Sequence, residues 1–102
     1  MFEEPDVERI IHALARSKIR MRIVNFLADN SEMSFNAHEI AVALGISYSN
    51  VTGALNGDGK KYRIDDSLVG MELVSHTGPG LTKELIMYRI TALGFNASAT
   101  AH

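Results

Sequence analysis

The glycine- and lysine-rich stretch GALNGDGKK, residues 53–61, has the residue types of a phosphate-binding P-loop. In that loop, backbone N–H groups and one lysine hold the phosphates of a nucleotide. The motif needs a second glycine five positions after Gly53, and a serine or threonine directly after its lysine. This chain has Asp58 at the first of these positions and Lys61 at the second. The spacing therefore argues against a nucleotide site.

Histidines and carboxylates form no catalytic or metal-binding pattern either. His38-Glu39 begins like a zinc-protease helix, but Val42 stands where the second histidine is needed. Asp65 and Asp66 are adjacent, so their side chains point apart, and acids at a predicted helix start are favoured by the helix dipole. The absence of cysteine excludes disulfides, thiol catalysis and cysteine-ligated zinc. We expect no enzyme activity, no catalytic residue, no metal and no cofactor.

Polar residues between positions 47 and 56 suit a different chemistry, the binding of nucleic acid. Asparagine can bond adenine with two hydrogen bonds, and serine and threonine bond bases or phosphates. The net charge of −2 counts mildly against nucleic-acid binding. However, residues 9–28 carry five basic and no acidic side chains, and three more basic residues lie between positions 60 and 63. A phosphate backbone meets such local patches rather than the net charge.

Two helices are predicted at the start of the chain. Apolar residues at i, i+3, i+4 and i+7 predict an amphipathic helix over 6–15. Its apolar side is either part of the core or a dimer face. Ser17 can cap a second helix over 17–29, in which Arg20 and Arg22 are expected outside the apolar stripe.

A helix-turn-helix is predicted over residues 36–56. Asn36 and Glu39 have the spacing of a capping box, which marks a helix start. The spacing Ala41-x3-Gly45-x5-Val51 allows two helices to pack closely around a left-handed glycine. The glycines that follow predict that the second helix ends near residue 56.

The rest of the chain predicts a further helix and a hairpin. A helix is expected over 65–73, and strands over 74–77 and 85–90 form a β-hairpin across 74–90. A short strand is possible at 33–35. One last helical turn is expected at 91–94, with frayed residues after position 96. The length predicts a single domain over 1–102.

The sequence HEIAVALGISYSNVTGAL resembles winged helix-turn-helix transcriptional regulators of the MarR/ArsR-like type, from bacteria and archaea. SKIRMRIVNFLADN is similar to the first core helix of that family, LVGMELVSHTG to its entry into the wing, and YRITALG to its exit. The resemblance covers residues 17–95. It implies an α+β, mainly α fold: a winged helix-turn-helix with an extra N-terminal helix and a C-terminal β-hairpin wing.

The resemblance also implies a function, which is sequence-specific binding of double-stranded DNA by a transcriptional regulator. The reading helix, 47–56, would enter the major groove. Its solvent-facing residues would then be Tyr48, Ser49, Asn50, Thr52 and Asn56. Phosphate contacts would come from Ser47, Lys60, Lys61, Arg63 and, at the wing, Lys83. The alternative is a winged-helix protein–protein interaction module in a larger transcription or replication assembly, which the net charge and the acidic N-terminus favour.

The chain departs from this family between the reading helix and the wing. From Ser47 to Val74 is 27 positions, more than the family usually takes, and the excess lies in a basic loop over 57–64. This loop is either a second DNA-contacting element or merely an insertion. Regulators of this kind usually bind as dimers, so a homodimer is expected. No apolar run is long enough for a bilayer, so we expect a cytoplasmic protein without membrane contact.

Overall fold

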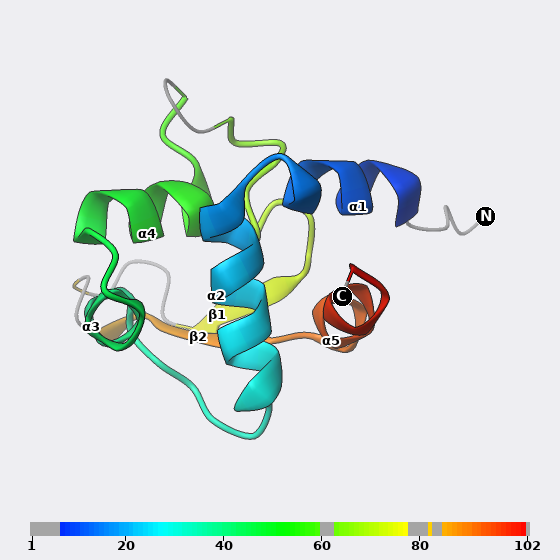
Figure 1. Cartoon of the computed structure of the whole chain (residues 1–102). Coiled ribbons are helices and arrows are strands. Elements are labelled where there is room, and N and C mark those ends of the chain that lie inside the picture. The colour runs from blue at the N-terminus through cyan, green and yellow to red at the C-terminus, as the bar shows by residue number, and fades with distance from the viewer. Residues whose placement is uncertain (1–6, 60–62, 78–81, 83–84, 102) are drawn as a thin grey trace.

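The structure is a computed structural model that describes residues 7–59, 63–77, 82 and 85–101 (Figure 1). Its class is α+β, mainly α, as predicted. The elements in chain order are α1 (Val7–Ala15), α2 (Lys18–Asp29), α3 (Ala37–Leu44), α4 (Tyr48–Asn56), β1 (Val74–Thr77), β2 (Met87–Ile90) and α5 (Ala92–Ala101).

Helix α2 runs through the middle of the molecule, with α3 and α4 on one side and α1 and α5 on the other (Figure 1). The core gathers around it, because its residues Ile23, Val24 and Leu27 have no exposed surface. The neighbouring helices and the turns before β1 add fully buried residues to the same core, which are Leu14, Ile40, Val51, Leu55, Leu68 and Leu73. The predicted helix-turn-helix is therefore held against a core that the first and last helices also help to form.

The two N-terminal helices lie close to their predicted positions. The Ser17 hydroxyl accepts a hydrogen bond from the Arg20 N–H (3.2 Å), which fixes the start of α2. Ile10 and Leu14 on α1 are buried, so the apolar side of α1 belongs to the core. The prediction that Arg20 lies outside the buried stripe is wrong, since only 8% of this residue is exposed. Its long aliphatic stem lets it lie along the apolar surface of the helix.

The helix-turn-helix forms as the sequence predicts. The Glu39 N–H donates to Asn36 Oδ1 (2.8 Å), and the Asn36 N–H donates to Glu39 Oε1 (2.9 Å), completing the capping box. Gly45 ends α3 in the left-handed conformation, with φ of 65°. Helices α3 and α4 then pack on each other, with Ala41 and Val51 buried.

The predicted hairpin is present, although its second strand is shorter than expected. Strands β1 and β2 pair antiparallel, from Val74 opposite Ile90 to Thr77 opposite Met87. The short strand expected at 33–35 is reduced to a single bridge between Phe35 and Tyr88. The reduction has a simple cause, because the next residue must already leave the sheet to cap α3.

The helix predicted over 65–73 is wrong, and this segment forms a series of turns. The N–H groups of Leu68 and Val69 donate to the carbonyls of Ala54 and Leu55, both at 2.9 Å. Those carbonyls lie in the last turn of α4, where a helix leaves its acceptors unused. The segment therefore completes the end of α4 instead of forming a helix of its own.

The frayed end expected after position 96 is also wrong, because α5 continues to Ala101. Two polar contacts explain its length. The Gly94 N–H donates to the Thr91 hydroxyl (3.0 Å) at the start of α5. Further along, the buried Ser98 hydroxyl donates to Asn25 Oδ1 on α2 (2.7 Å). The C-terminal helix is thereby held against α1 and α2.

Candidate nucleic-acid interface

The predicted reading helix presents its polar residues mainly at its N-terminal end. Ser47, Tyr48 and Ser49 are exposed there. The Ser47 hydroxyl accepts from the Asn50 N–H (3.2 Å), so this residue serves as the N-cap of α4. Asn50 and Thr52 are partly buried, and the Thr52 hydroxyl donates to the Ser49 carbonyl (3.2 Å). The first turn of α4 is therefore its most accessible part.

Asn56, at the end of α4, has a partner inside the protein. Its Nδ2 donates to the Tyr88 hydroxyl on β2 at 2.9 Å. This bond connects the last residue of the predicted reading helix to the second strand of the hairpin. The bond uses one N–H of the Asn56 amide, so a contact with DNA would use its second N–H or its Oδ1.

A groove lies between α4 and the hairpin. It is lined by Tyr48, Thr52 and Asn56, which are four positions apart on α4, by Ile86 and Tyr88 next to and on β2, and by Ala37 at the start of α3. Its volume is about 190 Å³. We call it the α4–wing groove, and it brings together three predicted site residues and three that the sequence did not indicate.

The predicted phosphate contacts are described only in part. Lys60, Lys61 and Lys83 lie outside the described residues. Arg63 is exposed, and its Nε lies 4.0 Å from Asp66 Oδ2. Helix α4 ends at Asn56 as predicted, so the basic loop over 57–64 begins where the sequence places it.

The two ends of this basic loop touch each other. Gly57 has a φ of 76°, and a Cβ added to it would lie 2.6 Å from the Cα of Ile64. Only glycine permits such an approach together with that conformation. The loop therefore leaves α4 and returns to nearly the same point.

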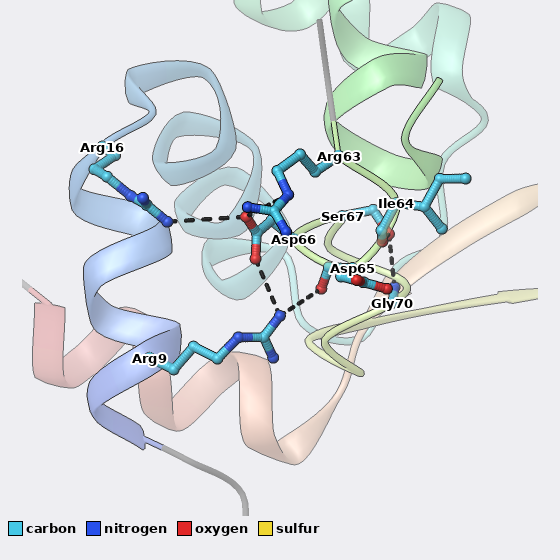
Figure 2. Close-up of polar contacts among 8 residues, drawn as sticks. All are labelled: Arg9, Arg16, Arg63, Ile64, Asp65, Asp66, Ser67 and Gly70. Carbon is cyan, nitrogen blue, oxygen red and sulfur yellow. Dashed lines mark hydrogen bonds and ion pairs between the residues drawn. The ribbon is translucent and has the colours of Figure 1, made fainter. Parts of the chain in front are cut away.

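Three arginines surround the carboxylate of Asp66 (Figure 2). Its side chain is only 9% exposed, and Arg9 Nη2 donates to its Oδ1 at 3.1 Å. Arg16 Nη2 lies 3.8 Å from Oδ2, and Arg63 is the third arginine. We call these four residues the Asp66 cluster. It ties α1 to the turns that follow the basic loop.

The Asp66 cluster shows that basic residues of the run over 9–28 bind groups of the protein itself. Arg9 and Arg16 point to Asp66, and Arg22 Nη2 donates to the Leu44 carbonyl at the end of α3 (2.6 Å). These arginines take part in contacts within the chain. The sequence showed the excess of basic residues but gave no sign of their partner, which is 57 positions away from Arg9.

The described ranges hold neither a metal site nor a membrane span. In those ranges, no group of three or more histidine and acidic side chains is arranged to hold a metal ion. No helix there combines the length and the apolar character that crossing a membrane requires.

A capped helix-turn-helix followed by a β-hairpin is the arrangement that defines the winged helix-turn-helix class. The comparison with protein families gives a closer relationship, because the EarA-like family model matches residues 10–100. The chain therefore belongs to the EarA-like family. The match begins within α1 and ends within α5, so it includes most of both terminal helices. Neither the curated proteins nor the solved structures gave a significant match.

Proposed function

We propose that this EarA-like protein is a sequence-specific double-stranded DNA-binding transcriptional regulator, with α4 as its reading helix. The observation that supports the proposal best is the α3–Gly45–α4 unit. Its capped helices and left-handed turn leave Tyr48 and Ser49 exposed in the first turn of α4. In helix-turn-helix proteins, the N-terminal residues of the second helix contact base edges in the major groove.

The elements beside α4 suit contacts with the flanking DNA backbone. In this proposal the β1–β2 hairpin is the wing, similar to the wing of MarR/ArsR-like regulators, and Lys83 stands between its two strands in the sequence. The basic loop supplies Lys60, Lys61 and Arg63. Phosphate contacts of this kind fix the position of a protein on DNA, whereas base contacts select the sequence.

The proposal includes a homodimer in the cytoplasm. Two copies related by a two-fold axis would place two reading helices on two half-sites of the DNA. The core position of Ile10 and Leu14 means that α1 cannot offer these two side chains to a partner.

Two substitutions test the proposed roles of reader and anchor. Asn50→Ala should relax sequence preference, by about 1–3 kcal/mol at one base position, because a base contact is lost. Lys61→Ala should weaken binding to all duplexes alike and reduce the salt slope by about 1. Both are measured by titrating a duplex selected from random sequence, and a scrambled duplex of the same length, at several salt concentrations. Identical effects of the two changes would show that the roles are wrongly assigned.

A further inference from the structure

We infer that the α4–wing groove binds a phosphodiester group of the DNA backbone through uncharged hydrogen-bond donors, with the buried Tyr88 hydroxyl among them. This inference rests on the proposed function, because it requires α4 to lie in the major groove. It adds Tyr88 to the interface, and it gives Tyr48 and Asn56 contacts with phosphate in place of contacts with bases.

The Tyr88 hydroxyl is the first observation. Tyr88 is 4% exposed, and its oxygen accepts a hydrogen bond from Asn56 Nδ2 (2.9 Å). A phenol also has one hydrogen to donate. Over the described ranges, no protein acceptor lies within bonding distance for that hydrogen. Since Tyr88 lines the groove, a group bound there can accept it, and leaving a buried hydroxyl without an acceptor is unfavourable.

The other polar groups of the groove also have hydrogens to donate. The Tyr48 hydroxyl has no partner among the residues that the structure describes. The Asn56 amide gives one N–H to Tyr88 and has a second available. The Thr52 hydroxyl already donates to the Ser49 carbonyl. A phosphodiester offers only acceptor oxygens, so it can accept from all three of these available donors.

The size and the remaining lining agree with a small group of this kind. Ala37 and Ile86 provide apolar surface on which a sugar can lie. The described lining contains no charged side chain. At about 190 Å³ the groove is smaller than the roughly 300–1,000 Å³ of sites for drug-sized ligands.

The position of the groove completes the inference. It lies between the helix proposed to enter the major groove and the hairpin proposed to contact the flanking DNA. A strand of DNA backbone separates one groove of the duplex from the next. That backbone therefore passes over the α4–wing groove when both elements are bound, and tyrosine and asparagine side chains are common phosphate ligands.

Tyr88→Phe and Tyr48→Phe test the inference, because each removes a single hydroxyl. Affinity should fall about tenfold for every duplex sequence, as expected for a hydrogen bond to a charged acceptor. Sequence preference should stay the same. The salt slope should also stay the same, since counterion release depends on cationic side chains and neither change removes one. Thr100→Val is the matched control, because it removes an exposed hydroxyl on α5 and should bind as the wild type does.

Stability must be measured beside affinity, since Tyr88→Phe also removes the bond to Asn56. Tyr48→Phe avoids this problem, because its hydroxyl has no partner in the described protein. A second readout uses duplexes with one methylphosphonate, which lacks a charged oxygen. When the methylphosphonate replaces the phosphate bound in the groove, the affinity of the wild type should fall. The same replacement should have little further effect on the affinity of Tyr88→Phe.

Three results would overturn the inference. The two tyrosine variants could bind like the wild type, they could alter sequence preference, or they could make the salt slope shallower. A wild-type protein that binds no duplex would be a different failure, because it removes the proposed function and this inference with it.

Discussion

The Asp66 cluster is the feature with the largest consequence at the scale of single residues. One nearly buried carboxylate meets three guanidinium groups from α1, from the end of the basic loop and from the residue after α1 (Figure 2). The arginines are 51%, 68% and 75% exposed, so water and salt screen their ion pairs. The hydrogen bond from Arg9 is the shortest contact, and we expect it to dominate the stability that the cluster provides.

Asp66→Asn should therefore lower the free energy of unfolding by about 1 kcal/mol, below the roughly 1.5–3 kcal/mol of a hydrogen bond to a charged group, because water and salt screen the exposed arginines. The adjacent Asp65→Asn is a matched control, because its side chain is exposed and should change stability by less than about 0.5 kcal/mol. Urea unfolding at low and high salt measures both. Equal effects of the two substitutions would contradict the special role of Asp66.

Single residues were predictable where their partners are close in sequence. The caps at Ser17 and Ser47 and the capping box at Asn36 need only residues three positions away. Asp66 and Tyr88 were not predictable, because Asp66 bonds Arg9 across 57 positions and Tyr88 bonds Asn56 across 32. Such pairs depend on the complete fold, and no spacing rule covers them.

At the scale of elements, the end of α4 is completed by a segment from beyond the basic loop. The turns in that segment donate two backbone N–H groups to the last carbonyls of α4. Their composition suggested a helix, but those N–H groups bond to α4 instead of to carbonyls in their own segment. The helix-turn-helix and the hairpin were predictable because they depend on local sequence patterns. The structure of residues 65–73 was not, because it depends on hydrogen bonds to the end of α4.

Gly57→Ala should destabilise the junction between α4 and the basic loop by about 1–3 kcal/mol. The added Cβ would lie 2.6 Å from the Cα of Ile64, and the position has a left-handed φ of 76°. Gly59→Ala provides the comparison, because its φ is 74° but no atom of the described residues beyond its chain neighbours lies within 4 Å of the added Cβ. Thermal unfolding should show a clearly larger loss for Gly57→Ala. A similar loss for both would mean that the close approach to Ile64 has no energetic weight.

At the scale of the whole molecule, α1 and α5 are parts of one core rather than additions to a smaller domain. Helix α5 packs on both α1 and α2, and Leu14 of α1 is 1% exposed. The family match over residues 10–100 agrees with a unit that includes both helices. The sequence left the role of α1 open, because the same apolar stripe suits a core or a dimer face.

Leu14→Ala should lower the free energy of unfolding by about 2–5 kcal/mol, because it leaves a cavity in the core. Ile11→Ala should cost less, since Ile11 is only partly buried. Urea unfolding measured at several protein concentrations separates core from dimer effects. A Leu14→Ala protein whose loss of stability disappeared on dilution would indicate a dimer face instead.

The central claim, that this chain binds DNA through a local basic surface despite a net charge of −2, is tested most directly by one titration. The wild-type protein is titrated with duplex DNA at a series of salt concentrations. The four proposed cationic contacts, Lys60, Lys61, Arg63 and Lys83, predict that affinity falls with a log–log slope of about −3.6 per protomer. Absence of binding at low salt, or binding that does not change with salt, would contradict the account.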